Sequence, residues 1–276
     1  MEKYLIALDL DGTLLKDWQT ISENTKSYLK NLKSQGHTIV LATGRPFRSS
    51  EKFYDELELT TPLINYNGGL VTAKHDPNFT PYSLTVKKEK VIDVFEKNKE
   101  FIHNAFGEVG DDIYLLHDTE EIKPLLHYFN GAQLFVGDFK DTLKSDTNGF
   151  IIIANKGDGQ YIEEYIKSTY PGDVLCRNWG NDLAYIIELY TAQTSKGNAI
   201  KYVGDYLGFS QDRIIAFGDA HNDIEMIKYA GLGVAMANAH DSLIEVADEV
   251  NKYSNIDDGI VKYLTEFFEN KKAMNS

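Results

Sequence analysis

The stretch Tyr4-Leu5-Ile6-Ala7-Leu8-Asp9-Leu10-Asp11-Gly12-Thr13 decides how this chain folds. Its apolar run at residues 4–8 predicts a buried strand, and two aspartates follow directly. In an open α/β sheet the ligand crevice lies beyond the carboxyl ends of the strands, so this strand would deliver Asp9 and Asp11 to a binding site. Because side chains two residues apart in a strand point the same way, we expect both carboxylates to face one site.

Two neighbouring carboxylates do not both stay ionised at low cost unless a cation lies between them or one of them holds a proton. The pair Asp9 and Asp11 therefore predicts either a metal site or a nucleophile beside a proton donor. Gly12 permits a turn after the strand, and Thr13 offers a hydroxyl. Taken alone, the segment has one alternative, an acidic turn after an edge strand.

Length and composition limit the class of protein. A chain of 276 residues lies near the size at which single cores divide, so we expect two domains. Its 28 Lys and Arg against 42 Asp and Glu give a net charge of −14, which disfavours nucleic acid and anionic membranes as partners. The one cysteine, Cys176, and the lack of a Cys/His cluster argue against disulfides and zinc. Without a recognisable signal peptide or membrane anchor, we expect a soluble cytoplasmic protein.

Strands and helices alternate at the start of the chain. Ser22 is a suitable N-cap for a helix at residues 23–34, and residues 37–42 read as the next strand. A second helix at about residues 48–58 follows. This alternation predicts a parallel sheet covered by helices on both faces.

The regular alternation of strands and helices ends at about residue 82. Candidate strands lie at residues 113–116, 150–154 and 184–189, with helical segments near residues 89–99 and 159–170. We therefore expect an α/β protein in which a Rossmann-like parallel sheet core, residues 1–81 and 190–276, is interrupted by an inserted α+β domain at residues 82–189.

A second group of polar residues, Ala42-Thr43-Gly44-Arg45-Pro46, follows the strand at residues 37–42 and should reach the same sheet edge as Asp9. Thr43 offers a hydroxyl, Gly44 lets the backbone approach closely and Arg45 adds a planar donor. Pro46 suits the first turn of a helix, whose unpaired N–H groups favour an anion. The alternative is an ordinary helix N-terminus with a threonine cap.

Lys196 opens a helix that runs to about Leu207. A cation at the start of a helix is electrostatically unfavourable, which suggests a use, such as neutralising a phosphoryl group or the crowded aspartates. The alternative is a solvated surface lysine.

The segment Gly218-Asp219-Ala220-His221-Asn222-Asp223 follows another apolar strand, at residues 213–217. If a helix begins near Asn222, the carboxylates of Asp219 and Asp223 approach one another at its entrance. Such hard oxygen donors suit Mg²⁺. The alternative is a helix cap, and His221 is expected to be an exposed loop residue with no second histidine beside it.

In this order and spacing, the chain resembles the haloacid dehalogenase superfamily of phosphohydrolases. Asp9 to Thr13 match its first motif, Asp-x-Asp-Gly-Thr; Thr43 fits the second motif and Lys196 the third, while Gly218-Asp219 with Asp223 fits the fourth. The Asn67-Gly68-Gly69 turn and the inserted domain resemble the Cof-like subgroup with a type IIB cap. Ala220-His221 departs from that subgroup, which usually has Gly and another residue there.

The resemblance implies a role for each of these positions. Asp9 would attack phosphorus and form an aspartyl-phosphate, and Asp11 would protonate the leaving oxygen and then activate water. Mg²⁺ would be held by Asp9, Asp219 and the backbone carbonyl of Asp11, with Asp223 as a further ligand or a support. Residues that would bind substrate are Thr43, Gly44, Arg45, Lys196 and Asn222, and Asn67 is a weaker candidate.

The function expected from these roles is Mg²⁺-dependent hydrolysis of phosphate monoesters of small metabolites, sugar phosphates above all. A sugar phosphomutase and a non-catalytic phosphate-binding protein of the same fold remain as alternatives. The sequence identifies neither the substrate nor the oligomeric state.

Overall fold

The computed structural model describes residues 2–127, 131–179 and 185–274 of the chain. The chain divides into two compact units. We call the unit made of Met1–Arg45, Ser50–Pro81 and Ser195–Ser276 the core unit, and the unit made of Pro46–Ser49 and Tyr82–Thr194 the cap unit.

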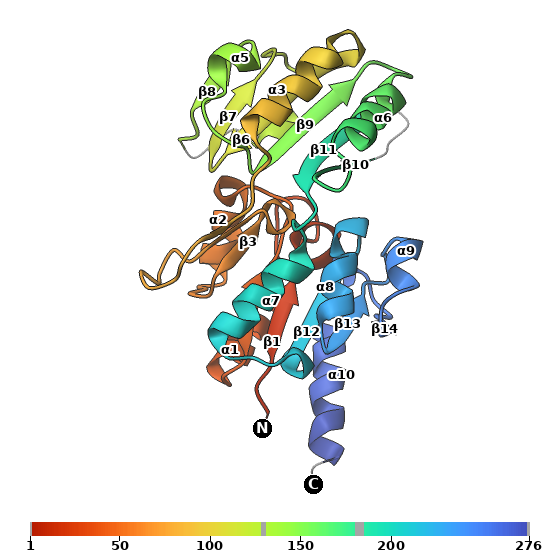
Figure 1. The fold of residues 1–276 in the computed structure, drawn as a ribbon. Helices are drawn as coiled ribbons and strands as arrows, with labels where there is room; N and C mark the ends of the chain where they lie inside the picture. Colours follow the sequence, from red (N-terminus) through yellow and green to blue (C-terminus); the bar gives the residue numbers. More distant parts are fainter. Residues whose placement is uncertain (1, 128–130, 180–184, 275–276) are drawn as a thin grey trace. The chain divides into compact units, whose positions relative to one another are not determined.

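A parallel sheet of five strands forms the centre of the core unit, in the order β14-β13-β12-β1-β2 (Figure 1). The central strand β1, with the sequence Leu-Ile-Ala-Leu, is buried throughout, as expected for a parallel strand covered on both faces. The strands are β1 (Leu5–Leu8), β2 (Thr38–Leu41), β12 (Ile214–Gly218), β13 (Leu232–Ala235) and β14 (Glu249–Val250). The predicted parallel α/β core is confirmed.

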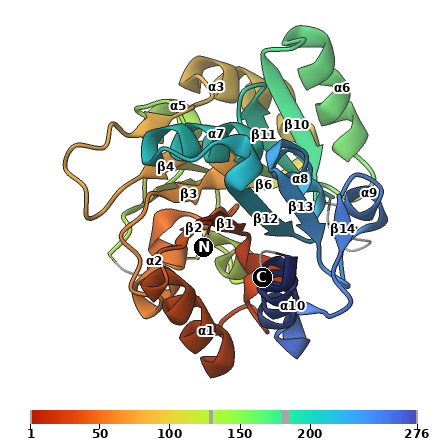
Figure 2. The same cartoon turned by 90° about the horizontal axis from the view of Figure 1, so that it is seen from below.

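Helices cover both faces of this sheet. Figure 2 shows α1 and α10 on one face and α7 and α8 on the other. The predicted cap at Ser22 is present, since its hydroxyl accepts a 3.0 Å hydrogen bond from the backbone N–H of Thr25. The helices of the core unit are α1 (Glu23–Ser34), α7 (Lys196–Leu207), α8 (Ile224–Tyr229), α9 (Asp241–Ile244) and α10 (Gly259–Met274), and α2 (Phe47–Glu56) begins in the cap unit and continues into the core unit.

The strand order reverses direction at β1. The chain passes from β1 to β2 on one side, and β12 lies on the other side and continues outward to β13 and β14. Ligands of open α/β sheets bind where the strand order reverses in this way. Beyond β2, the core unit continues with a hairpin of β3 (Leu63–Asn65) and β4 (Leu70–Thr72), which are joined by the turn Tyr66–Gly68, and Ile64 forms a parallel bridge with Ala42.

The cap unit contains a sheet of six strands in the order β10-β11-β9-β6-β7-β8, antiparallel except for the pair β7 and β8. Figure 1 shows α3 and α6 on one face of it, over the larger of its two apolar clusters. The strands are β5 (Tyr82–Ser83, outside this sheet), β6 (Ile102–Val109), β7 (Asp112–Leu115), β8 (Leu134–Val136), β9 (Gly149–Ala154), β10 (Val174–Asn178) and β11 (Tyr185–Thr191). The helices are α3 (Lys88–Lys97), α4 (Lys123–Leu126), α5 (Phe139–Thr142) and α6 (Gly159–Thr169).

The inserted α+β domain is thus present, but its sheet is larger than predicted. Strands β6, β8 and β10 were not expected from the sequence. The central strand β6 reads Ile-His-Asn-Ala-Phe-Gly-Glu-Val, which lacks the alternation of a half-buried strand. Gly107 within it fits because a Cβ there would lie 2.9 Å from the ring of Phe150 on β9. Residue 184, the first of one predicted strand, lies outside the described residues.

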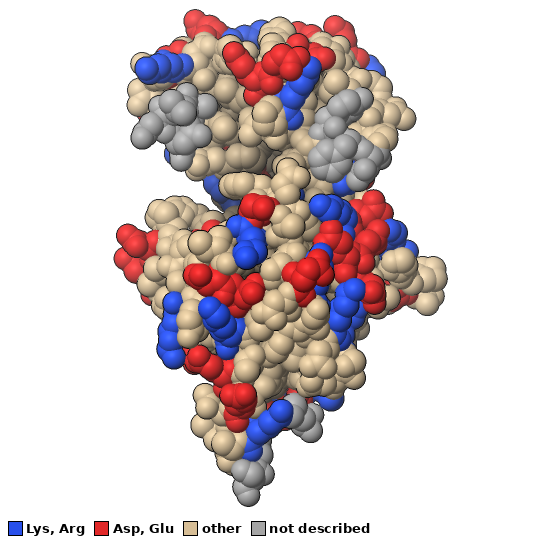
Figure 3. Space-filling view, turned by 180° about the vertical axis from the view of Figure 1, so that it is seen from behind, with Lys and Arg blue, Asp and Glu red and all other residues tan. Residues whose placement is uncertain are grey.

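Acidic and basic side chains are interspersed on the face seen in Figure 3. That face therefore carries both charges rather than a continuous basic surface. Within the described ranges, none of the helices combines the length and the apolar content that a membrane crossing requires.

Candidate active site

Three neighbouring strands of the core sheet end at predicted site residues. Asp9 follows β1, Thr43 lies just beyond β2 and Asp219 follows β12. The register pairs Leu8 at the end of β1 with Phe217 near the end of β12, so Asp9 and Asp219 leave the sheet side by side. The carboxyl edge of the parallel sheet therefore gathers them, as expected from the sequence.

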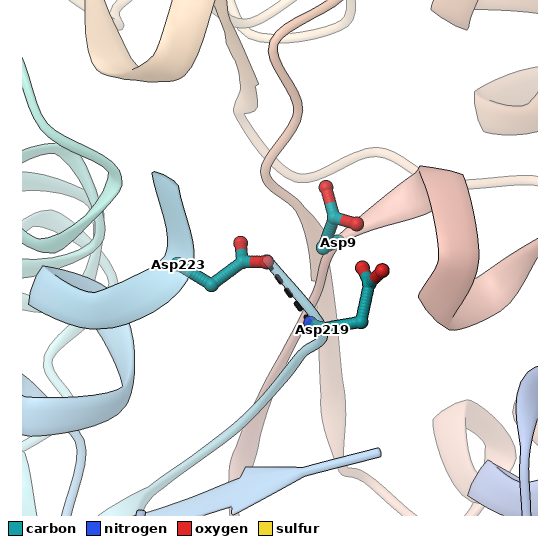
Figure 4. A group of neighbouring side chains, drawn as sticks. All are labelled: Asp9, Asp219 and Asp223. Atoms are coloured by element: carbon teal, nitrogen blue, oxygen red, sulfur yellow. Dashed lines mark hydrogen bonds between the residues drawn. The ribbon is translucent and has the colours of Figure 1, made fainter. Parts of the chain in front are cut away.

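A group of three carboxylates lies at this edge. Asp9, Asp219 and Asp223 each offer one oxygen, and these atoms lie within 4.8 Å of one another (Figure 4). The turn after β12 holds Asp223 in place, because its Oδ2 accepts 3.1 Å hydrogen bonds from the backbone N–H groups of Asp219 and Ala220. Asp223 thus accepts backbone N–H groups of the turn, a role that the alternative interpretation gave to Asp219 or Asn222, and it still presents its other oxygen to the group.

Lys196 is fully buried beside two of these carboxylates. Its Nζ donates 2.6 Å hydrogen bonds to Oδ1 of Asp9 and to Oδ1 of Asp223. Ser195 caps α7, and Gly197 allows α7 to approach α8, since a Cβ at this glycine would lie 2.5 Å from the carbonyl oxygen of Glu225. The alternative of a solvated lysine is wrong.

The charges in this group do not balance. Burial raises the pKa of Asp9 well above its usual range, and Asp223 and Asp219 raise it further, against the opposing effect of Lys196. Burial, together with the charge of Asp223, raises the pKa of Asp219 to about 6. Burial lowers the pKa of Lys196, but Asp223 and Asp9 outweigh it and hold the lysine protonated.

Three carboxylates with one ammonium leave a formal charge of −2 when all are ionised. In the part of the chain that the structure describes, no Lys or Arg forms an ion pair with Asp219. A divalent cation that prefers oxygen ligands would fit this donor set and would neutralise its negative charge.

The loop after β1 packs directly on Asp219. The Thr13 hydroxyl donates a 3.0 Å hydrogen bond to Asp219 Oδ1. Gly12 has a φ of +77°, and a Cβ there would lie 2.2 Å from Asp219 Oδ2, so only glycine fits. Asn238 supports the loop by donating a 2.8 Å hydrogen bond from Nδ2 to the Gly12 carbonyl. This role of Asn238 was not predicted from the sequence, although Asn238 follows β13 at the same sheet edge.

Asp11 differs from the expectation that it faces the same site as Asp9. Strand β1 ends at Leu8, and a π-type turn at Leu10–Leu14 replaces strand alternation. The carboxylate of Asp11 instead accepts hydrogen bonds on both oxygens from Arg45, with 2.7 Å between Arg45 Nε and Asp11 Oδ2. Each aspartate therefore has its own cationic partner, and the Asp11 carboxylate lies outside the group of three.

The predicted substrate-binding residues Thr43, Gly44 and Asn222 come together through Asn67. The Thr43 carbonyl accepts a 3.0 Å hydrogen bond from the Asn67 N–H, and Asn222 Nδ2 donates to Asn67 Oδ1 over 2.8 Å. A Cβ on Gly44 would lie 3.0 Å from Asn67 Oδ1. Thr43 also accepts the Arg45 N–H at 3.1 Å, the local cap of the alternative interpretation, while its own hydroxyl proton remains a donor.

His221 is exposed, as expected, but a second histidine does lie beside it. The ring centroid of His240 is 3.9 Å from that of His221. The expectation of an isolated histidine was wrong, because the loop after β13 returns to the site.

Comparisons with known proteins show the family of this chain. The sequence model of the haloacid dehalogenase-like hydrolase family matches residues 6–264 of this chain. A 5-amino-6-(5-phospho-D-ribitylamino)uracil phosphatase of Bacillus subtilis is 36% identical over 266 residues, which cover 96% of this chain and 97% of the relative.

Solved structures share the fold. A haloacid dehalogenase-like hydrolase from Bacteroides thetaiotaomicron superimposes with a TM-score of 0.83 at 24% identity, covering 96% of this chain and 100% of that one. A subclass IIB sugar phosphatase superimposes with a TM-score of 0.76 at 21% identity, covering 96% and 98%. The match to the family model over nearly the whole length confirms the resemblance seen in the motifs, and this chain belongs to the haloacid dehalogenase-like hydrolases.

Proposed function

We propose that this protein is a Mg²⁺-dependent phosphatase that hydrolyses phosphate monoesters of small metabolites through an aspartyl-phosphate on Asp9. One observation carries this proposal: Asp9, Asp219 and Asp223 form a group with an unbalanced negative charge, and the buried Lys196 contacts Asp9. The proposal agrees with family membership and with the activity named for the 36% identical relative.

Asp9, Asp219 and Asp223 would hold Mg²⁺, together with the backbone carbonyl of Asp11. When bound, the ion would neutralise the carboxylates and the transferred phosphoryl group. Asp219, which has a pKa of about 6 and no ion pair within the described ranges, is the ligand with most to gain from the ion.

Asp9 would attack phosphorus with a carboxylate oxygen while the bond from phosphorus to the leaving oxygen breaks. Asp11 would donate its proton to that leaving oxygen. In the second step, water attacks phosphorus, Asp11 takes a proton from the water, and the bond between Asp9 and phosphorus breaks to release phosphate. This divides one difficult displacement into two easier ones.

The phosphoryl oxygens need donors. In the proposal, four groups of the core unit supply these donors: Lys196 Nζ, the Thr43 hydroxyl, the Gly44 backbone N–H and the Asn222 amide. Positioning and charge neutralisation of this kind account for most of the catalysis of phosphoryl transfer.

The names of two similar proteins support a substrate class for this one. The relative named above acts on a ribityl phosphate and a structural neighbour acts on sugar phosphates, so both cleave esters of hydroxyl-rich carbon chains. We propose the same class for this protein, with 5-amino-6-(5-phospho-D-ribitylamino)uracil as the first substrate to assay. In this account, residues 82–189 form the cap domain that selects the leaving group.

The test is phosphate release from a panel of sugar phosphates, ribityl phosphates and nucleotides, with Mg²⁺ or EDTA. We expect release that requires Mg²⁺ and is lost in Asp9→Asn. The matched control is Asp205→Asn, which removes an exposed carboxylate on α7 that pairs with Lys201. Release unaffected by Asp9→Asn would refute the mechanism. Transfer of phosphate between substrate positions without net release would identify a mutase, and binding without either would identify a non-catalytic protein.

A further inference from the structure

Arg45 makes an unusual set of contacts for a residue expected to bind substrate. Its side chain is 8% exposed and lies against the loop after β1. Nε donates to Asp11 Oδ2 over 2.7 Å, and a terminal guanidinium nitrogen donates to Asp11 Oδ1. The same terminal nitrogen donates a 2.7 Å hydrogen bond to the carbonyl of Trp18.

Arg45 is itself held in place. Its backbone N–H donates to the Thr43 hydroxyl over 3.1 Å, which ties it to the end of β2. The ring of Phe53 on α2 lies 5.4 Å from the guanidinium carbon. These contacts hold both the backbone of Arg45 and the plane of its guanidinium group, which therefore meets Asp11 in one orientation.

A two-point contact between guanidinium and carboxylate fixes the orientation of the carboxylate, whereas a lysine in that place would act as a point charge. Asp11 needs such a contact, because its backbone lies in a turn and the side chain is 24% exposed. Among the described residues, the hydrogen bonds found for its carboxylate come from Arg45.

We propose that Arg45 is a positioning residue for Asp11 rather than a ligand of the phosphoryl group. The proposal rests on the proposed function, since it assumes that Asp11 exchanges protons with the leaving group and with water. Arg45 orients the carboxylate of Asp11, and through Trp18 it fixes the loop that carries this aspartate.

The leaving group distinguishes positioning from phosphoryl binding. An alkyl oxygen leaves poorly without a proton, whereas p-nitrophenolate leaves well without one. The value of kcat/KM reports the first irreversible step, in which the ester bond breaks. A misoriented Asp11 therefore slows an alkyl phosphate and spares p-nitrophenyl phosphate, while a lost phosphoryl ligand slows both.

The experiment measures kcat/KM of wild type and Arg45→Gln with ribitol 5-phosphate and with p-nitrophenyl phosphate. Since a general acid contributes about 10² to 10⁴-fold, we expect Arg45→Gln to lower kcat/KM for the alkyl ester by about 10²-fold or more. For p-nitrophenyl phosphate we expect a loss below about fivefold, with a burst of nitrophenolate because the step that needs Asp11 as base becomes slow.

Asp11→Asn should produce the same selective loss, and the double variant should lose little more than either single variant, since both changes remove one function. If Arg45→Gln does not fold, Arg45→Lys replaces it, because that variant keeps the charge and loses the fork. The matched control is Arg213→Gln, which breaks an arginine pair with Glu2 at the opposite end of β12.

Equal losses of kcat/KM for both esters, or additive losses in the double variant, would overturn the role of Arg45. Failure of the proposed function looks different: wild type would then hydrolyse neither ester, or Asp9→Asn would keep its activity. The two failures are therefore distinguishable in the same assay.

Discussion

At the residue scale, Asp219 is the carboxylate of the acidic group that Lys196 does not contact, and a cation would neutralise it. Its carboxylate lies beside Asp9 and Asp223 and accepts the Thr13 hydroxyl, while Lys196 contacts the other two acids. A second residue, Arg45, gives Asp11 a charge partner of its own. The site thus separates the two aspartates of the first motif into different electrostatic surroundings.

The raised pKa of Asp219 predicts how stability depends on pH without metal. Burial and Asp223 raise this pKa from 3.8 to about 6, so between these values the folded protein holds a proton that the unfolded chain releases. Asp219 alone should therefore make stability in EDTA fall as pH rises from about 4 through about 6, by about 3 kcal/mol at 1.36 kcal/mol per pKa unit. Denaturant unfolding at several pH values measures this.

Asp219→Asn should reduce that slope and should raise the Mg²⁺ concentration for half-maximal activity by about tenfold or more. Saturating Mg²⁺ should also flatten the slope in wild type, because the ion favours the ionised carboxylates. An unchanged Mg²⁺ titration in Asp219→Asn would count against its role as a ligand.

The sequence predicted much of the acidic group at this scale and less of its surroundings. Asp9 and Asp219 each follow the carboxyl end of one of two paired parallel strands, so topology alone brings them together. The contact of Asp11 with Arg45 was not predicted, because the turn that Gly12 indicates begins already at Leu10 and so interrupts strand alternation before Asp11.

At the scale of elements, the turn after β1 connects the sheet to the site. Gly12 in this turn has a φ of +77°, and Gly208, which ends α7, has a φ of +78°. A Cβ at Gly12 would lie 2.2 Å from Asp219 Oδ2, whereas a Cβ at Gly208 meets nothing within 4 Å. Substitutions at the two glycines therefore cause similar backbone strain, but only a substitution at Gly12 also disturbs the site.

Gly208→Ala should cost about 1 kcal/mol of unfolding free energy, the usual cost of a left-handed backbone, and should keep kcat. Gly12→Ala carries the same strain and also displaces Asp219, so it should lose more stability and at least about tenfold in activity. Denaturant unfolding and phosphate release measure both. Equal activity of the two variants would show that the turn does not act through Asp219.

Elements with a regular pattern were predicted well. The helix at Glu23–Ser34 and the strand at Thr38–Leu41 follow from an N-cap and an apolar run. In the cap unit, the strand at Ile102–Val109 was missed because its polar residues and glycine are tolerated only by tertiary packing, as at Gly107 against Phe150.

At the scale of the whole molecule, every residue proposed to hold Mg²⁺ or the phosphoryl group belongs to the core unit. A ligand stabilises the part of a protein that binds it, by RT ln(1 + [L]/Kd). Mg²⁺ should therefore slow amide hydrogen exchange in β1, β12 and α7 and leave exchange in β9 and β11 of the cap unit unchanged. Equal protection of both units would contradict a metal site confined to the core unit.

The covalent mechanism is tested most sharply by a search for the phosphoryl group on Asp9. Asp11→Asn is mixed with p-nitrophenyl phosphate and Mg²⁺, quenched in acid during the burst and digested with trypsin, and the peptide of residues 4–16 is fragmented in a mass spectrometer. We expect one added phosphoryl group on Asp9, and none when Asp9→Asn is combined with Asp11→Asn. Release of nitrophenolate with no phosphoryl group on this peptide, or with the group on another residue, would contradict it.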